Sequence, residues 1–472
     1  MKKLAFVAVF LLLAATSVQG QYQHLTITAD SLASALAPLC EYLEEHAGLE
    51  DTVVTVAQVL ASSSGRDNQE KVRNFIKQAY TDWGVTHVLL AADHDQIPCR
   101  LIWVEINTQW RDWIPTELYF AALDGNWDAD MDGQYGEPED SVDFMPDVYL
   151  GRVALATPGE MARFVEHFLT YSEDSTAAYL EDVLLAGFDF SATYRGELCC
   201  EIYDSLYLPQ TMRAYKVYDS HSPHNHEDSV KTLLDQGMHV WVQYDHCDYN
   251  VMGCGYTNHR YLLWVSELDD MRNGTNYSIM LAAGCYPSAF DSSFCMSETL
   301  LTLAEGGCVA TCANSRVGFG TDPDPYRGGS VFYVEKCLEW FWTRGNRSSM
   351  EGVTSAHGQA AALAASDVVW RWCHFEFLLS GEPAMPVWVP EGSGVAEERT
   401  KAQVQRTSQT IVKGVLVLQK RRMKDDGGAR LVDAAGRVVM ELRPGQNDVR
   451  GIAPGVYFVR GEGPSSRVVI AD

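Results

Sequence analysis

Two predicted strands end in side chains that could act together as a nucleophile and a base. The apolar run 240–244 leads into Asp245-His246, and the run 279–284 leads into Cys285. A thiol is a weak nucleophile at neutral pH until a nearby imidazole favours its thiolate. Backbone N–H groups after the two strands could hold an oxyanion. If the strands are neighbours in a parallel sheet, the pair predicts cysteine-dependent acyl transfer.

Position alone does not single out Cys285, because the chain has twelve cysteines and Cys312 also ends a strand-like run. A cysteine in an exported chain is often buried or disulfide-bonded. The spacing of the cysteines is irregular and contains no CxxC pair, which argues against a zinc ribbon.

An acidic segment predicts a calcium site. Residues 124–143 contain eight carboxylates and no basic residue, and the stretch from Asp128 to Glu139 fits D-x-D-x-D-G-x5-E. Oxygen donors at alternate positions can wrap one calcium ion. The expected ligands are Asp128, Asp130, Asp132, Gln134 and Glu139. Pro138 argues against a flanking helix, so we expect a calcium loop inside a larger domain; the alternative is a solvated acidic loop.

A histidine cluster offers different chemistry. His221, His224 and His226 lie near Glu227 and Asp228, and such a group could bind a transition metal such as zinc. Its proline and polar neighbours favour a solvated loop.

The elements that must position these groups alternate between strand and helix from about residue 30 to 390. Strands are expected at 53–59, 85–92, 183–188, 215–218, 239–244, 278–283 and 308–312, and helices at 30–46, 68–83, 226–236 and 296–304. Near-continuous apolar strands between helices favour an α/β fold with a mainly parallel sheet covered on both faces. Sites in such sheets form beyond the carboxyl ends of the strands.

Both ends of the chain differ from this central region. Lys2 and Lys3, an apolar run at 4–15 and small residues to Gly20 predict a signal peptide over 1–20. A domain is expected at 21–390, with two subdomains at about 21–180 and 181–390 as one option. A polar linker at 391–410 precedes short β-prone runs in 411–472, which predict a small β-sandwich.

The charge balance excludes one class of function. Thirty-six basic and sixty-three acidic residues give a net charge of −27, which excludes nucleic-acid binding by a basic face.

No apolar run reaches the ~20 residues that span a bilayer.

Over roughly residues 80–390 the sequence resembles the gingipain-type cysteine peptidases, which are related to caspases and legumains. The resemblance is carried by HVLLAAD at 87–93, PDVYLGRV at 146–153, YDH at 244–246, MGCG at 252–255, GC at 284–285, AFD at 289–291 and LSGEPAMPVW at 379–388. It implies a caspase-like α/β fold, Cys285 as nucleophile, His246 as general acid/base, and calcium sites.

The resemblance also implies an acidic residue near the histidine, which maps onto Asp147; a structural aspartate at a strand start and Asp245 are the alternatives. A glycine follows the histidine in gingipains, whereas Cys247 does here, and a disulfide with Cys254 is one option for it. The amides of Cys285 and Cys247 would then hold the oxyanion.

The tail resembles the C-terminal sorting domain of bacterial type IX secretion, through LVD at 431–433, GR at 436–437, PGQNDVR at 444–450 and APGVYFVR at 453–460. This resemblance implies periplasmic export, passage across the outer membrane, and secretion or surface attachment. A carbohydrate- or protein-binding β-domain is the alternative.

Together these features predict a secreted cysteine endopeptidase that acts on proteins or peptides. The alternatives are an inactive calcium-binding surface protein on the same fold and a zinc hydrolase built on the histidine cluster.

Overall fold

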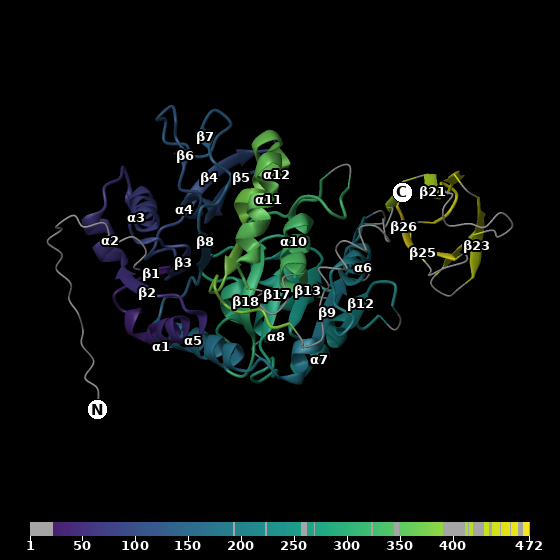
Figure 1. Ribbon diagram of the computed structural model, residues 1–472, viewed down its shortest axis with the longest axis horizontal. Coiled ribbons are helices and arrows are strands. Elements are labelled where there is room, and N and C mark those ends of the chain that lie inside the picture. The colour runs from purple at the N-terminus through teal and green to yellow at the C-terminus, as the bar shows by residue number, and fades with distance from the viewer. Residues whose placement is uncertain are drawn as a thin grey trace.

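A ten-stranded sheet forms the centre of the protein (Figure 1). The computed structural model describes residues 22–389, apart from 192–193, 222–223, 256–261, 269, 322–323 and 344–348, and parts of 411–471. The strand order is β12-β9-β13-β17-β18-β19-β8-β3-β1-β2. The bounds are β1 His24–Thr28, β2 Asp51–Thr55, β3 His87–Ala91, β8 Tyr149–Arg152, β9 Asp182–Gly187, β12 Arg213–Tyr218, β13 Val240–Tyr244, β17 Ser278–Ala282, β18 Cys308–Asn314 and β19 Phe377–Ser380.

All neighbouring strands in this sheet are parallel except β18 and β19, which are antiparallel. The predicted mainly parallel α/β fold is therefore confirmed. The single reversal divides the sheet into two halves that run in opposite directions. The carboxyl ends of β13, β17 and β18 consequently share an edge with the beginnings of β19 and β8.

Helices cover both faces of the sheet. Successive residues of β9 show this, because Leu185 belongs to a core with α6 and α10, whereas Leu184 belongs to another core with α7 and α9. The helices are α1 Ala37–Tyr42, α2 Val56–Ser62, α3 Asn68–Trp83, α4 Leu118–Ala121, α5 Pro158–Glu173, α6 Gly196–Leu206, α7 His226–Gln236, α8 Val265–Leu268, α9 Met296–Leu300, α10 Ser330–Thr343, α11 Gly352–Ser366 and α12 Val368–Glu376.

Local sequence signals set several helix boundaries. Helix α3 begins where the Asp67 side chain accepts a hydrogen bond from the Glu70 amide, and it ends at Gly84, whose φ is 84°. The predicted strand 53–59 stops at Thr55 because that residue forms a capping box with Gln58 and starts α2. The predicted helix 30–46 is broken into a 3₁₀ turn, α1 and a π-helical turn.

Small antiparallel sheets lie outside the central ten-stranded sheet. They are β4 Arg100–Glu105 with β5 Arg111–Thr116, β6 Gly125–Asn126 with β7 Ser141–Val142, β10 Asp189–Ser191 with β11 Tyr194–Arg195, and β14 Cys247–Asp248 with β15 Val251–Gly253 and β16 Leu262–Trp264. Two of them, β10–β11 and β14–β16, follow strands of the central sheet at the edge where His246 and Cys285 lie.

The C-terminal segment forms two further sheets. One has the order β20-β26-β25-β22-β23 and the other pairs β21 with β24. The bounds are β20 Ile411–Lys413, β21 Val415–Leu418, β22 Ala429–Asp433, β23 Val438–Leu442, β24 Gly445–Asp448, β25 Gly455–Arg460 and β26 Ser466–Ala471. The expected leader 1–20 and linker 391–410 lie outside the described residues. Among the described helices, none is both long and apolar enough to cross a membrane.

Candidate active site

The strands that carry the predicted reactive pair are neighbours. Strands β13 and β17 pair in parallel, with Val240 opposite Ile279 and Gln243 opposite Ala282, an offset of 39 residues. The same offset separates His246 from Cys285, so extending this register brings the two residues level just beyond the strand ends. Neighbouring strands lie about 4.8 Å apart. The expected adjacency of the two strands is confirmed.

The Cys285 thiol is free, half-buried and close to backbone amides. Burial raises the pKa of this thiol to about 12, and hydrogen bonds from the backbone of Gly318 and Cys247 partly oppose that rise. Amide donors around a sulfur are suited to stabilising negative charge that develops there. A neighbouring base is still needed to take the proton at neutral pH.

The chain turns sharply at Cys285. Tyr286 has φ of 65°, in the left-handed region that non-glycine residues rarely adopt. Such a conformation costs about 1–3 kcal/mol and is common at active sites. Asn314 supports the turn, because its Nδ2 donates to the carbonyls of Ala283 at 3.2 Å and Gly284 at 2.9 Å. Sequence reasoning missed both residues, since a tyrosine carries no signal for a left-handed turn.

Gly318 is a second residue that the sequence analysis missed. A Cβ atom at this position would lie 2.5 Å from the Ala283 carbonyl and 2.6 Å from Asn314 Nδ2. Only glycine lets the backbone come this close to the end of β17, and its amide then reaches the Cys285 thiol. The glycines at 318 and 320, shortly after a predicted strand, were the available signal.

His246 is exposed at the edge of the sheet, and its ring lies 4.8 Å from the ring of Phe190. Asp245 is fully buried: its Oδ1 accepts from the His246 amide at 2.6 Å and its Oδ2 from the Gly255 amide at 2.7 Å. Asp245 therefore holds the loop that follows β13.

The predicted role of Asp147 needs correction. Its Oδ2 accepts a hydrogen bond from the Leu123 amide at 2.7 Å. It precedes β8, and three strands stand between β8 and β13, which corresponds to roughly 19 Å across the sheet. The structure does not bring Asp147 to His246. The non-sequential strand order could not be read from the chain.

All twelve cysteines, each within the described part of the chain, are free thiols, so the suggested Cys247–Cys254 disulfide is not formed. The Cys247 sulfur instead packs against the backbone at the end of β17, since a Cβ added to Gly284 would lie 2.4 Å from it. The Cys247 side chain therefore faces the β17 backbone.

Carboxylates of the acidic loop lie close together, but they are not the residues that the sequence analysis predicted as ligands. Two groups have carboxylate oxygens within 4.8 Å of one another: Asp128, Asp130 and Asp140, and Asp130, Asp132 and Glu137. Asp140, and not Glu139, turns inward and accepts hydrogen bonds from the amides of Ala129, Gly136 and Glu137. The Gln134 side chain donates to Asp132 Oδ2 at 2.9 Å. Asp140 therefore takes the place that the sequence analysis gave to Glu139.

The histidine cluster does not converge on a metal position. Among the described residues, the groups that could hold an ion do not include His221, His224 or His226. His226 is buried, stacks on Phe188 and has Nδ1 3.2 Å from the Cys254 carbonyl. His221 and His224 are exposed, as a solvated segment predicts, whereas His226 begins α7 and packs in the core.

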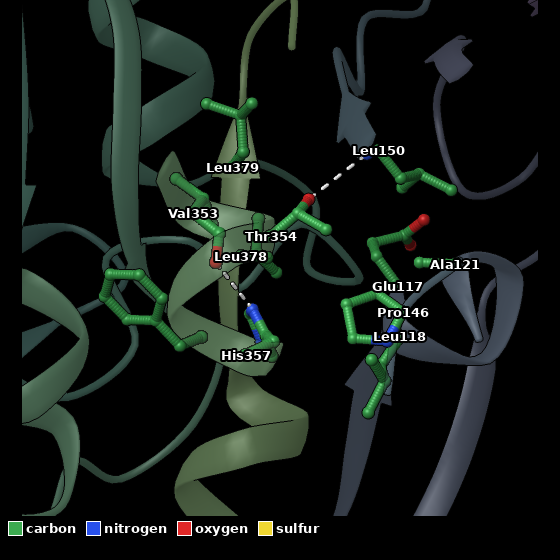
Figure 2. A pocket seen from close by; sticks show the side chains of 11 residues that line it. Glu117, Leu118, Ala121, Pro146, Leu150, Val353, Thr354, His357, Leu378 and Leu379 are labelled. Carbon is green, nitrogen blue, oxygen red and sulfur yellow. Dashed lines mark hydrogen bonds between the residues drawn. The ribbon is translucent and has the colours of Figure 1, made fainter. Parts of the chain in front are cut away.

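A small cavity lies away from the reactive pair, between α4 and α11 (Figure 2). Its volume is about 20 Å³, room for about one water molecule. Inside it Thr354 Oγ1 accepts from the Leu150 amide at 3.4 Å, and His357 Nδ1 lies 2.9 Å from the Val353 carbonyl. The described residues that line it include no cysteine.

Comparison with known proteins agrees with the geometry. Residues 17–388 match peptidase family C25. The crystal structure of the Arg-specific cysteine proteinase gingipain R superposes with a TM-score of 0.60 at 15% identity, covering 95% of this chain and 98% of that one. A complex of the pro- and mature domains of Porphyromonas gingivalis RgpB gives 0.58 at 14% identity, with 95% and 100% covered. No curated protein matches.

At these identities the solved structures establish the shared gingipain-like fold. The family match covers most of the chain, including both strands that end in His246 and Cys285. The chain belongs to peptidase family C25 and is a cysteine endopeptidase.

Proposed function

We propose that this protein is an exported endopeptidase in which Cys285 is the nucleophile and His246 the general acid/base. The observation that carries the proposal is the shared register of β13 and β17, in which one offset of 39 residues relates the paired strands and the two side chains. A free thiol supported by two backbone amides adds to it.

In the proposed reaction the Cys285 thiolate attacks the scissile carbonyl carbon and forms a C–S bond. The carbonyl oxygen becomes an oxyanion, which the amides of Cys285 and Cys247 hold. Collapse of this intermediate breaks the C–N bond, and His246 gives its proton to the leaving amine. Water then hydrolyses the thioester, with His246 taking the proton, and the free thiol is restored.

The raised pKa of Cys285 makes the role of His246 testable. A thiol with a pKa of about 12 is almost wholly protonated at pH 7 unless the imidazole accepts its proton. We expect iodoacetamide to label Cys285 near neutral pH in the unmodified protein. In His246→Ala, labelling should begin only at strongly alkaline pH.

A peptidyl probe that alkylates thiols distinguishes this proposal from an inactive protein on the same fold. Labelling should be lost in Cys285→Ala and retained in Cys254→Ala, which removes a buried thiol of the neighbouring loop. An unmodified protein that is not labelled at Cys285 would contradict the catalytic proposal and favour the inactive alternative.

We also propose a structural calcium ion in the 128–140 loop. The residues fit such a group: the donors are all carboxylate oxygens, which calcium prefers, and two sets converge within 4.8 Å. Asp128, Asp130, Asp132, Glu137 and Asp140 would hold the ion. Arg66 Nη1, 2.5 Å from Asp128 Oδ2, shares part of that charge.

Chelation tests the calcium proposal. EDTA should lower the melting temperature by several degrees, and added calcium should restore it. Asp130→Asn should reduce the effect, while Asp143→Asn, outside both convergent sets, should not. An unchanged melting temperature in EDTA would argue for a solvated acidic loop.

We also propose that the protein is exported, on the basis of the two terminal segments of the chain. Residues 1–20 would direct passage to the periplasm, and residues 411–472 would engage the type IX machinery for secretion or surface attachment. Cell fractionation tests this: removal of 411–472 should retain the enzyme in the periplasm, whereas a carbohydrate-binding tail would leave secretion intact.

A further inference from the structure

The segment 315–319, which follows β18, passes directly over the turn at Cys285. Its Arg316 carbonyl accepts a hydrogen bond from the Tyr286 amide at 2.9 Å. Gly318 then packs on the end of β17, and its amide reaches the Cys285 thiol. The position of this segment therefore decides how well the sulfur is supported.

Two side chains hold the backbone on either side of Gly318. Trp372 of α12 donates from Nε1 to the Val317 carbonyl at 2.9 Å. Ser330, the first residue of α10, accepts from the Phe319 amide through its Oγ at 3.0 Å, and its own amide donates to the Phe319 carbonyl at 2.8 Å. Gly318 is thus fixed through both of its neighbours in the chain.

Glu376, the last residue of α12, joins these two side chains. Its Oε1 accepts from Ser330 Oγ at 3.0 Å and its Oε2 from Trp372 Nε1 at 3.2 Å. All three side chains are buried, with exposed fractions of 0% for Glu376 and 1% for Ser330 and Trp372. The Glu376 carbonyl also accepts from the Ser315 amide at 2.8 Å. One carboxyl group therefore orients both groups that hold Gly318.

The protonation of Glu376 bears on the thiol. A negative charge on this carboxyl would raise the pKa of Cys285. Burial raises the pKa of Glu376 itself well above its ordinary value, and hydrogen bonds to the carboxyl and the charge of Arg316 only partly oppose that rise. A neutral Glu376 keeps its two contacts without opposing the thiolate.

We propose that Ser330, Trp372 and Glu376 are positioning residues that hold the Gly318 amide on the Cys285 thiol and so favour its thiolate. They act through the backbone of residues 317–319 and take no part in bond making. This inference rests on the proposed catalytic role of Cys285.

Two substitutions that each remove a single hydrogen-bonding group test the inference. In Ser330→Ala and Trp372→Phe, the Gly318 amide should be less well placed to stabilise negative charge on the sulfur. We expect the pH midpoint of Cys285 labelling by iodoacetamide to rise by about 0.5–1 unit. We expect kcat/KM to fall about tenfold, less than for outright loss of such a donor. An unchanged midpoint in both variants would overturn the inference.

Ser278→Ala is the matched control. It removes a buried hydroxyl at the opposite end of β17, where Ser278 Oγ donates to the Met238 carbonyl at 2.5 Å. We expect the melting temperature to fall about as far as in Ser330→Ala, with the midpoint unchanged and kcat/KM within about twofold. An equal rise of the midpoint in this control would mean that lost stability, and not the position of Gly318, affects the thiol.

Two substitutions at Glu376 test its neutral, positioning role. Glu376→Gln keeps a group that can contact both Ser330 and Trp372, so we expect kcat/KM within about threefold of the unmodified enzyme. Glu376→Leu removes both contacts at similar volume and should lower kcat/KM about tenfold or more. Equal losses in the two variants would contradict the proposed role. If Glu376→Leu does not fold, Ser330→Ala and Trp372→Phe decide.

The outcomes separate this inference from the proposed function. An enzyme that labels at Cys285 and cleaves peptides, with the same pH midpoint in Ser330→Ala and Trp372→Phe, contradicts only the positioning role. A protein that neither labels nor cleaves contradicts the catalytic proposal as well.

Discussion

The region around Cys285 and His246 differs from the region around Cys40 and His24, although both combine a thiol, an imidazole and carboxylates. His24 is fully buried, with Nδ1 2.7 Å from Asp51 Oδ1 and Nε2 3.1 Å from Glu382 Oε1. The Cys40 thiol also hydrogen-bonds to Asp51, and burial together with the two carboxylates raises its pKa far above the ordinary value.

The two regions differ in solvent access and in the hydrogen bonds made to the thiol. His246 is exposed, and the Cys285 thiol receives hydrogen bonds from two backbone amides, which oppose the effect of burial and of Glu376 and Asp248 on its pKa. His24 is sealed from solvent, and the Cys40 thiol bonds to the Asp51 carboxylate. Negative charge opposes the formation of a thiolate. Proximity of a cysteine, a histidine and an acid is therefore insufficient: a nucleophile also needs space for a substrate and hydrogen-bond donors that favour its thiolate.

The largest expected effect is on activity. Cys285→Ala should reduce kcat/KM by at least about 1,000-fold, because the covalent intermediate cannot form. Cys40→Ala, which removes the half-buried thiol beside Asp51, should change kcat/KM by less than about twofold. Steady-state kinetics on a peptide that the unmodified enzyme cleaves measures both, and a large loss in Cys40→Ala alone would reverse the assignment of the two regions.

The next effect is on stability and its pH dependence. Burial lowers the pKa of His24, but Glu382 and Asp51 outweigh it and raise the pKa from 6.5 to about 10. The charged form is thus favoured in the folded state. Its stabilising contribution is complete below about pH 6.5 and is lost as the pH rises through 10. We expect His24→Gln to lower the free energy of unfolding by about 3–5 kcal/mol near neutral pH.

Denaturant unfolding at several pH values checks this prediction. The difference between the unmodified protein and His24→Gln should shrink toward pH 10 and above. His246→Gln, a change at an exposed site, should alter the free energy of unfolding by less than about 0.5 kcal/mol. A pH-independent difference for His24→Gln would mean that the imidazole is neutral in the folded protein.

The smallest effect concerns Cys247, where gingipains carry glycine. Cys247→Gly keeps the backbone amide that reaches the Cys285 thiol and removes only the sulfur that packs on Gly284. We expect kcat/KM to change by less than about tenfold, since loss of one oxyanion donor typically costs 100-fold or more. A larger loss would assign the Cys247 side chain itself a part in the reaction.

Much of the fold was predictable because buried parallel strands form continuous apolar runs. The strands before His246 and Cys285 and the helix 68–83 were read from the sequence in nearly the observed positions. The reversal at β19 was not predicted, because no strand was expected at 377–380 and the antiparallel pairing with β18 depends on contacts far apart in the chain.

The site was less predictable than the fold. Residues that directly end a strand could be assigned to the edge of the sheet, but Gly318 and Asn314 arrive there through tertiary packing. The acidic spacing indicated Glu139, whereas the turn of the loop selects Asp140. Asp147 was misassigned because lateral strand order depends on contacts far apart in the chain.

The position of β19 has a consequence for how the enzyme matures. This strand, at residues 377–380, lies between β18 and β8 and joins the two halves of the sheet. A nascent chain that has not yet been synthesised past this point leaves an unpaired edge on each half. The continuous sheet therefore forms only after nearly the whole peptidase region has left the ribosome, which postpones assembly of the proteolytic scaffold until late in translation.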